Sequence, residues 1–272
     1  LLFPVVLNED GDDDDDDDDD KDEVDAIGED GPALKKKRRR SSLSNVVVDI
    51  KDADIIADLS TLEGRQTAVD GIAAAAPDGL DGFIPCAGVG PHISPPSMVA
   101  RINFFGALAV TEGVKSLVAK KQGAIVMISS NSATMGYEQE VVDLMLAGNE
   151  AGASAKLDEI GNGQLAYGGG KYALSCWLRN ASKAYAENGI RLNAVAPGFT
   201  QTPLTDAGRS DPEFAEVLEE FIKSIPIGRP GLPEDIAEAT CFLLDPKKAG
   251  FISGTILFVD GGHDAMLRPN SF

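Results

Sequence analysis

The chain has 272 residues with 44 acidic and 24 basic side chains, which give a formal net charge of −20. Such acidity disfavours nucleic acid as a partner, because a phosphate-binding surface needs a basic field. Three widely spaced cysteines and two histidines make neither a disulfide framework nor a metal-binding motif. No apolar run is long enough to span a bilayer, so we expect a cytoplasmic protein without a metal or a membrane partner.

The first 44 residues differ in composition from the rest of the chain. Nine consecutive aspartates run from Asp12 to Asp20, and six consecutive bases run from Lys35 to Arg40. This segment cannot bury enough apolar surface to offset chain entropy, so we expect residues 1–44 to be disordered. The basic block is either a nuclear-import or anionic-surface patch, or simply an electrostatic partner for the acidic run.

From residue 45 onward, short apolar runs alternate with longer amphipathic segments. Strands are predicted at Val46–Ile50, just before Asp58, and at Gly82–Cys86, Ala124–Ser129, Arg191–Val195 and Thr255–Val259. Helices are predicted at Leu62–Ala76, Pro95–Val118, Glu138–Ala147, Tyr167–Asn188, 211–224 and 233–244. This alternation indicates βαβ units, and therefore one α/β domain over residues 45–272 with a doubly wound, Rossmann-like, mostly parallel sheet.

Ligands of such sheets bind beyond the carboxyl ends of the strands, where two carboxylates are candidates. Asp49 lies at the end of the first predicted strand. A carboxylate there accepts hydrogen bonds from the adenosine ribose and repels a 2′-phosphate, which selects NAD over NADP. Asp58 and Leu59 end the next strand and are candidates for the adenine edge. The alternative interpretation is that both aspartates only form turns.

Tyr167 and Lys171 are candidates for proton transfer. Their i,i+4 spacing places them on one face of a predicted helix. A lysine ammonium favours tyrosinate and should lower the pKa of the phenol, so that it exchanges a proton with an alcohol or carbonyl. Ser130, at the end of the strand AIVMISS, offers a hydroxyl to the same oxygen. Spacing alone does not choose between Ser130 and its neighbours Ser129 and Ser132.

Several segments occur together and in order. They are DIKDADIIADLS at 49–60, CAGVGP at 86–91, INFFGA at 102–107, IVMISS at 125–130, LAYGGGKYAL at 165–174, RLNAVAPGFTQTPL at 191–204, IGRPGLPEDIA at 227–237 and FVDGGHDAMLRP at 258–269. With them, the chain from about Val46 to Phe272 resembles the short-chain dehydrogenase/reductase family. Within that family it looks most like the bacterial 3α-hydroxysteroid dehydrogenase/carbonyl reductases.

The resemblance implies a role for each matching residue. Tyr167 would be the general acid/base, Lys171 its electrostatic partner and a nicotinamide-ribose ligand, and Ser130 the residue that orients the substrate oxygen. Asn103 would hold, through its backbone, a water in the proton relay. The implied NAD-binding residues are Asp49, Asp58, Leu59, Cys86, Ala87, Gly88, Tyr167, Lys171, Pro197, Gly198, Thr200 and Thr202. Cys86 stands where the family usually has asparagine.

Two segments depart from the family pattern. Residues 134–164 separate Ser130 from Tyr167 by a long insertion, which we expect to be helical, to lie over the substrate cleft and to disturb the usual helix–helix subunit contact. A surface excursion without a role is the alternative. The family also opens with a strand and a TGxxxGxG turn that approaches the pyrophosphate. Residues 20–30, DKDEVDAIGED, lack that turn.

Three interpretations follow from these observations. The first is an NAD(H)-dependent oxidoreductase, dimeric or tetrameric, that interconverts a secondary alcohol and a ketone or aldehyde, with a hydroxysteroid or xenobiotic carbonyl as an expected substrate. The second is a non-catalytic family member that binds partners through its charged N-terminal tail. In the third, a frameshift or mis-joined exon has replaced the first strand, glycine turn and first helix with residues 1–44.

Overall fold

A computed structural model of the chain describes residues 8–9, 43–202, 205 and 219–271. The strands are β1 Asn8–Glu9, β2 Leu43–Ser44, β3 Val48–Asp49, β4 Ile55–Ile56, β5 Gly82–Phe83, β6 Ala124–Ile128, β7 Arg191–Pro197 and β8 Ile256–Val259. The helices are α1 Leu62–Ala75, α2 Pro96–Ala100, the π-helix η1 Arg101–Gly106, α3 Ala107–Lys120, the 3₁₀-helix η2 Asn131–Thr134, α4 Gln139–Leu146, α5 Glu150–Ile160, α6 Gly163–Ala186, α9 Pro233–Leu244, α10 Pro246–Ala249 and α11 His263–Leu267.

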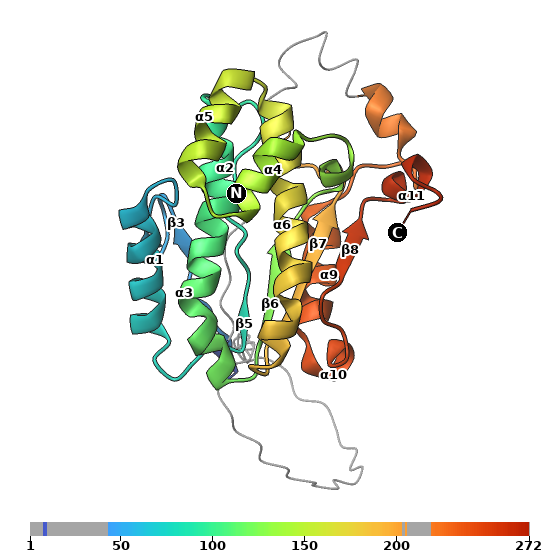
Figure 1. Cartoon of the computed structure of the whole chain (residues 1–272). Coiled ribbons are helices and arrows are strands. Elements are labelled where there is room, and N and C mark those ends of the chain that lie inside the picture. The colour runs from blue at the N-terminus through green and yellow to red at the C-terminus, as the bar shows by residue number, and fades with distance from the viewer. Residues whose placement is uncertain (1–7, 10–42, 203–204, 206–218, 272) are drawn as a thin grey trace, which may run out of the picture.

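Parallel strands joined by helices confirm the predicted Rossmann-like α/β fold (Figure 1). Strands β5, β6, β7 and β8 form one parallel sheet in that order, and β3 pairs in parallel with β4 in a second sheet. Among the described residues, no strand bridges β3 and β5. A small apolar space of about 20 Å³ lies there, lined by Val48, Leu59, Ile72, Phe83, Pro85, Cys86, Ala87, Ala107 and Val110.

The disorder expected for residues 1–44 stays a prediction, although four of these residues are described as strands. Asn8–Glu9 pairs antiparallel with Leu43–Ser44, so that β1 and β2 form a small ladder immediately before β3. The physical reason is that the chain entering β3 is already extended, and its backbone groups find partners in β1. The acidic run and the basic block lie outside the described residues, as does the segment where the glycine turn is missing.

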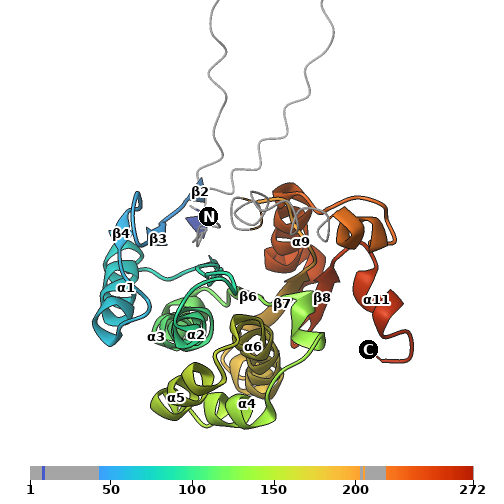
Figure 2. The ribbon, with the colours of Figure 1, turned by 90° about the horizontal axis from the view of Figure 1, so that it is seen from above.

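The central strand β6 shows how the helices are distributed around the sheet. Successive side chains of a strand point to opposite faces. Accordingly, Ile125 and Met127 pack into a core with α1, α3 and α6, while Val126 and Ile128 pack into a second core with α9. Viewed from above, these two helical layers lie on opposite sides of the strands (Figure 2). All five β6 residues are buried, as expected for a parallel sheet covered on both faces.

The continuous helical segment Pro96–Lys120, formed by α2, η1 and α3, is long and apolar enough to cross a membrane by length and composition alone. Its most apolar 18-residue window has a mean hydropathy of 1.2. This helix does not overturn the expectation of no membrane-spanning segment, because buried core helices pass the same test of length and composition. In the structure, 56% of that window is buried within the fold, because η1 and α3 pack against α1, α6 and β5. Its apolar residues are thus used as core, with Val114 and Val118 fully buried.

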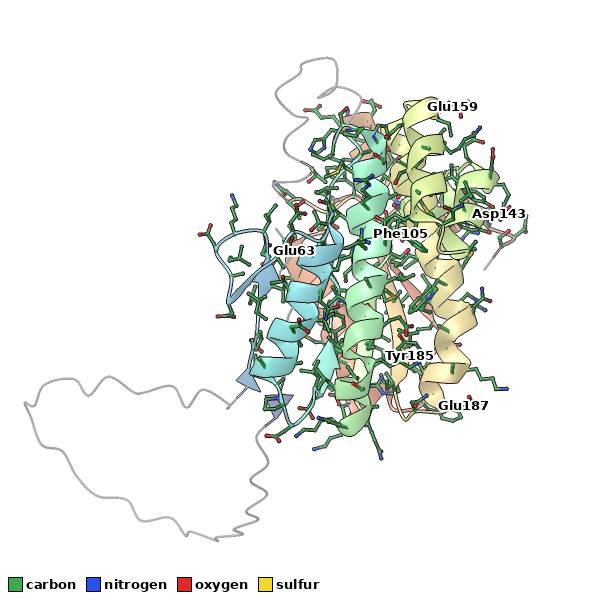
Figure 3. All side chains as sticks on the ribbon, turned by 60° about the vertical axis from the view of Figure 1, so that its left-hand side comes forward. Glu63, Phe105, Asp143, Glu159, Tyr185 and Glu187 are labelled. Atoms are coloured by element: carbon green, nitrogen blue, oxygen red, sulfur yellow. The ribbon has the colours of Figure 1, made fainter. Side chains whose placement is uncertain are left out.

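The insertion at residues 134–164 folds into α4 and α5, which pack against α2 and α6. The expected helix at Glu138–Ala147 is confirmed as α4, and α5 agrees with the expectation of a helical insertion, although no separate helix was predicted at its position. Acidic side chains such as Asp143 of α4 and Glu159 of α5 line the outer surface, while Phe105 and Tyr185 lie between helices (Figure 3). The face of α2 and α6 beneath the insertion is therefore covered by the chain itself. Whether the insertion also covers the substrate cleft stays a prediction.

The remaining predicted elements are found with shifted ends. Helix α6 begins at Gly163 rather than Tyr167, because the Asn162 side chain accepts hydrogen bonds from the Gln164 and Leu165 N–H groups and caps it one turn earlier. Strands β3 and β5 are shorter than predicted. Of the helix expected at 211–224, only residues 219–224 are described, and they are helical.

Candidate active site

Ser130 begins a short turn at the carboxyl end of β6. Its extended backbone makes it the N-cap of η2, and its Oγ accepts from the N–H and the hydroxyl of Ser132, at 3.1 and 2.9 Å. Ser129 points the other way, where its Oγ lies 2.8 Å from Ser175 Oγ and 3.3 Å from the Lys171 carbonyl. Of the three serines left open by spacing, Ser129 is thus committed to the interior, and Ser130 faces the tyrosine.

Tyr167 and Lys171 lie on one face of α6, which crosses the end of β6. Lys171 is 7% exposed, and its Nζ donates a 2.7 Å hydrogen bond to the Ile128 carbonyl. The same Nζ lies 5.7 Å from the centre of the Tyr167 ring. The side chains of Ser130 and Tyr167 are within hydrogen-bonding reach of each other. The predicted serine, tyrosine and lysine therefore meet at one point.

The protonation of this group differs from our expectation. Burial raises the pKa of Tyr167, and the hydrogen bond with Ser130 only partly offsets that effect. Burial also lowers the pKa of Lys171 to about 8. We expected the lysine ammonium to lower the pKa of the tyrosine. That expectation was wrong for this structure, because withdrawing the phenol and the ammonium from water disfavours the charged form of each.

Asn103 lies in the π-helix η1, next to the site. Its side chain makes two bonds to one residue: Oδ1 accepts from the Val89 N–H at 2.8 Å, and Nδ2 donates to the Val89 carbonyl at 2.9 Å. Gly88 packs tightly beside it, because a Cβ at Gly88 would lie only 3.2 Å from Asn103 Oδ1. A π-turn frees helix carbonyls and is common at functional sites. The predicted backbone contact of Asn103 with a water stays a prediction.

The expected adenosine-binding residues lie along the other end of the same edge. Asp49 is the last residue of β3, and its Oδ1 accepts a 2.6 Å bond from the Ile50 N–H. Asp58 is exposed, and its Oδ1 accepts from the Ser60 N–H at 2.9 Å, just before α1. Gly64 lets α1 approach this turn, because a Cβ there would collide with the Asp58 carbonyl. Both aspartates therefore form turns, and each uses its Oδ1 to accept the backbone N–H bond described above.

The expected nicotinamide-binding residues follow β7. Pro197 ends the strand, and Thr200 Oγ1 donates to the Gly198 carbonyl at 3.1 Å. Thr205 Oγ1 donates to the Thr200 carbonyl at 2.8 Å and accepts from the Thr202 N–H at 3.0 Å. These bonds tie Gly198, Thr200, Thr202 and Thr205 to one another just after the end of β7.

Cys86, Ala87 and Gly88 follow β5 and complete the edge. Burial raises the pKa of the Cys86 thiol to about 12, so this cysteine is neutral. It is half-buried between the two sheets and close enough to Lys171 for their charges to interact. A thiol here offers neither the donor nor the acceptor strength of the amide that the family usually has at this position.

The described residues fit the two ends of a dinucleotide better than its centre. Carboxylates stand at the adenosine end, and threonine hydroxyls and the buried Lys171 ammonium stand at the nicotinamide end. No glycine turn that could meet a pyrophosphate occurs in the described part of the chain. No cluster of three or more His, Cys, Asp or Glu side chains suited to a metal occurs in it either.

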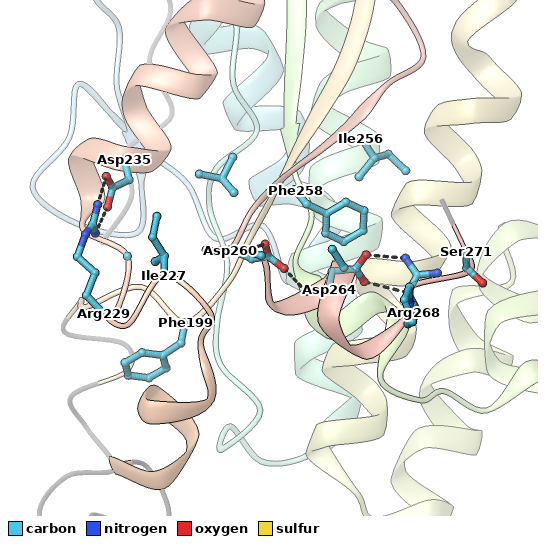
Figure 4. A pocket seen from close by; sticks show the side chains of 16 residues that line it. Phe199, Ile227, Arg229, Asp235, Ile256, Phe258, Asp260, Asp264, Arg268 and Ser271 are labelled. Carbon is cyan, nitrogen blue, oxygen red and sulfur yellow. Dashed lines mark hydrogen bonds and ion pairs between the residues drawn. The ribbon is translucent and has the colours of Figure 1, made fainter.

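A surface hollow of about 710 Å³ lies elsewhere. It is bounded by β8, α11 and the turn before α9, and Phe199, Asp260, Asp264 and Arg268 are among its lining residues (Figure 4). None of Ser130, Tyr167 and Lys171 lines it. The hydroxyl, phenol and ammonium groups suited to proton transfer thus gather at the carboxyl edge of β6 and not in this hollow.

The chain is similar to known oxidoreductases along most of its length. It is 39% identical over 249 residues to the 3-alpha-hydroxysteroid dehydrogenase/carbonyl reductase of Comamonas testosteroni, an alignment that covers 89% of this chain and 95% of that protein. The chain belongs to the short-chain dehydrogenase/reductase family. It is an oxidoreductase, and the comparisons lend no support to a non-catalytic role.

Further comparisons agree with this assignment. The crystal structure of the 3-alpha-hydroxysteroid dehydrogenase from Pseudomonas sp. B-0831 complexed with NADH superposes with a TM-score of 0.78 at 42% identity, covering 83% of this chain and 89% of that one. Acetoacetyl-CoA reductase of Synechocystis is 32% identical over 72% of this chain and 76% of its own length. A family model described as Enoyl-(Acyl carrier protein) reductase matches residues 152–264.

Sequence patterns missed several residues that shape the site. Arg65, which is 5% exposed, binds Glu150 of the insertion through two bonds of 2.7 Å and also donates to the Leu59 and Arg101 carbonyls. These partners lie far apart in the sequence, at Leu59, Arg101 and Glu150, so no local spacing reveals them. His263 and Asp264 contact η2 from the far end of the chain, and the only local signal was their place directly after a strand and two glycines.

Proposed function

We propose that this chain is an NAD(H)-dependent oxidoreductase that interconverts a secondary alcohol and a ketone or aldehyde, with Tyr167 as the general acid/base. The observation that carries the proposal is the meeting of the Ser130 hydroxyl, the Tyr167 phenol and the Lys171 ammonium at the end of β6. The similarity to hydroxysteroid dehydrogenases supports a hydroxysteroid or xenobiotic carbonyl as the substrate class, and the neighbour bound to NADH supports NAD.

Each residue would have one task in carbonyl reduction. Ser130 and Tyr167 would both donate hydrogen bonds to the substrate oxygen and so fix the carbonyl carbon in place. When bound, the reduced nicotinamide supplies the hydride to that carbon. As the negative charge develops on the oxygen, Tyr167 gives it the phenolic proton, and the Lys171 ammonium stabilises the resulting phenolate. Oxidation of an alcohol would run through the same groups in reverse.

The dinucleotide would be held by the edge residues described above. Asp49 would accept from the adenosine ribose hydroxyls, and Asp58 and Leu59 would lie near the adenine. Cys86, Ala87 and Gly88, which follow β5 on the same edge, would also contact the dinucleotide. Pro197, Gly198, Thr200 and Thr202 would line the nicotinamide, and Lys171 would donate to its ribose. We further propose a cytoplasmic location. We also propose a homodimeric or homotetrameric state, and light scattering would test it by measuring the molar mass in solution.

The deciding experiment compares the full chain with its Tyr167→Phe variant. NADH consumption is followed with a panel of steroid and small ketones. We expect measurable turnover in the original chain and a loss of about 10³-fold in the variant, because general acid catalysis contributes about 10²–10⁴-fold. Ser129→Ala, at a neighbouring serine that faces the interior, serves as a control. Equal turnover by the original chain and Tyr167→Phe would overturn the proposal, as would no turnover across the whole panel.

A further inference from the structure

The turn that presents Ser130 is held by a helix 130 residues further along the chain. Asn131 Nδ2 lies 3.3 Å from His263 Nδ1, and Thr134 Oγ1 donates a 2.9 Å bond to Asp264 Oδ1. Asn131 and Thr134 are the first and last residues of η2, so α11 contacts both ends of the turn. Asn131 is 6% exposed, and its amide therefore has little access to water as an alternative partner.

Helix α11 is itself firmly attached. The Asp264 carboxylate accepts two 2.9 Å bonds from Arg268, one on each oxygen (Figure 4). The Asp264 N–H donates to Asp260 Oδ2 at 2.6 Å, which fixes α11 to the end of β8. Bidentate arginine–carboxylate pairs are among the stronger and more directional polar contacts in proteins. Asp264 therefore presents its Oδ1 to Thr134 from a fixed position.

His263 joins a third segment to the same turn. Its ring is 4% exposed, and the two nitrogens face different elements: Nδ1 faces Asn131, and Nε2 lies 3.5 Å from the Ser224 hydroxyl. The ring of Phe221 packs edge-on against it at 4.9 Å between centroids. A neutral imidazole has one acceptor and one donor nitrogen. Nδ1 can therefore accept from the Asn131 amide while Nε2–H points to Ser224.

We propose that His263 and Asp264 are positioning residues for the catalytic serine, acting through Asn131 and Thr134 at the two ends of η2. The inference rests on the proposed function, since Ser130 is there the group that orients the substrate oxygen. His263 adds a connection to residues 219–224, which lie beside the nicotinamide-binding segment after β7. The buried ring of His263 thus links residues 219–224 to η2, the turn that begins at Ser130.

The consequence for catalysis is specific. The hydrogen bonds of the His263 and Asp264 side chains go to Asn131, Ser224, Thr134 and Arg268 and not to Ser130, Tyr167 or Lys171, so cofactor binding should not depend on them. A serine displaced by a fraction of an ångström still binds the substrate oxygen but holds it poorly aligned, and misplacement of about 1 Å costs on the order of 10²-fold in rate. Loss of these contacts should therefore reduce kcat and leave the KM for NADH unchanged.

The test combines hydrogen exchange with kinetics on the full chain. His263→Leu removes both ring contacts, while His263→Asn keeps an oxygen acceptor near the place of Nδ1. We expect the amides of residues 130–135 to exchange at least about tenfold faster in His263→Leu, and kcat to fall about tenfold, with partial recovery in His263→Asn. Thr134→Val and Asn131→Ala, which alter η2 alone, should reproduce the loss, and neither should add to it when combined with His263→Leu.

Thr240→Val provides the matched control. Thr240 is 4% exposed and bonds only within α9, at the Ile236 carbonyl, so its loss tests general destabilisation. Unchanged exchange at residues 130–135 in His263→Leu would overturn the positioning role whether or not the protein is active. Additive losses in the double variants would also overturn it. If the original chain lacks turnover but exchange changes as expected, the proposed function fails and the structural link stands.

Discussion

The Nζ atom of Lys171 lies 2.7 Å from the Ile128 carbonyl oxygen, which ties the helix that bears Tyr167 to the central strand. One buried ammonium thus has two tasks, since it also faces the Tyr167 ring. Burial of this group is unfavourable for its charge and lowers its pKa from 10.5 to about 8. Lys171 should therefore support activity at the expense of stability.

The first prediction concerns stability against pH. Because the pKa of Lys171 is lower in the folded protein than in the unfolded chain, the unfolded chain binds more protons between pH 8 and 10.5. The free energy of unfolding should rise across that window, by up to about 3 kcal/mol from this group. Lys171→Met should remove the rise. Urea unfolding at pH 7 and pH 10 measures it, with the exposed Lys183→Met as the control. Equal slopes in the original chain and Lys171→Met would contradict the prediction.

The second prediction concerns the direction of the reaction. Burial raises the pKa of Tyr167, so the phenol is protonated at neutral pH and ready to act as an acid. Carbonyl reduction should therefore be nearly constant at neutral pH, while alcohol oxidation, which needs the phenolate, should rise about tenfold per pH unit. Measurement of kcat/KM in both directions from pH 6 to 10 tests this.

Two serine variants sharpen that experiment. The hydrogen bond with Ser130 lowers the pKa of Tyr167, so Ser130→Ala should move the oxidation profile to higher pH as well as reduce its height. Ser129→Ala should leave the midpoint in place, because Ser129 bonds to Ser175 and the Lys171 carbonyl. An equal shift of the midpoint in Ser130→Ala and Ser129→Ala would show that the pKa of Tyr167 does not set the pH profile of oxidation.

Features that depend on neighbouring residues could be predicted from the sequence. The spacing of Tyr167 and Lys171 placed both on one helical face without further data, and the apolar run Ala124–Ile128 correctly identified the central strand. Helix α5 was missed because its sequence, EAGASAKLDEI, has few large apolar residues and two helix-weakening types, glycine and serine. Its Asn149 cap, which accepts from the Gly152 N–H, was the available signal.

Contacts between remote segments could not be predicted in the same way. The pair Arg65–Glu150 joins residues 85 positions apart, and the link from Asn131 to His263 spans 132. Neither has a periodic pattern, since each depends on how complete helices pack. The protonation of Tyr167 and Lys171 was likewise hidden, because burial, which decides it, is a property of the folded chain.

The third prediction concerns the anchor of the insertion. The side chain of Arg65 is 6% exposed and that of Glu150 is 28% exposed. Glu150→Gln should leave a buried guanidinium incompletely paired and cost about 2–4 kcal/mol of unfolding free energy. Glu220→Gln removes an equally short but exposed pair, with Lys223, and should cost less than about 1 kcal/mol. Chemical denaturation of both variants measures these losses of unfolding free energy. Similar losses in Glu150→Gln and Glu220→Gln would show that the Arg65–Glu150 pair does not anchor the insertion.

The fourth prediction concerns Asn103. Its replacement by alanine would leave the N–H and carbonyl of Val89 without their side-chain partners, next to Gly88 at the cofactor edge. We expect a loss of about 1–3 kcal/mol in unfolding free energy, because two partly buried polar groups become unpaired. We also expect weaker NADH binding by calorimetry. Asn188→Ala, whose side chain makes one exposed bond to the Ala184 carbonyl, should change neither quantity appreciably.

The last prediction concerns cofactor choice at the end of β3. A carboxylate at that position repels the 2′-phosphate of NADP and binds the free ribose hydroxyls of NAD. Asp49→Ser should therefore lower kcat/KM with NADH and raise it with NADPH, changing their ratio at least about tenfold. Asp54→Ser is the matched control, because Asp54 sits in the same loop but bonds to the Val47 N–H. If Asp49→Ser lowers kcat/KM equally with NADH and NADPH, Asp49 acts only as a turn former, through its 2.6 Å bond to the Ile50 N–H. A changed ratio in Asp49→Ser alone would assign it to the ribose.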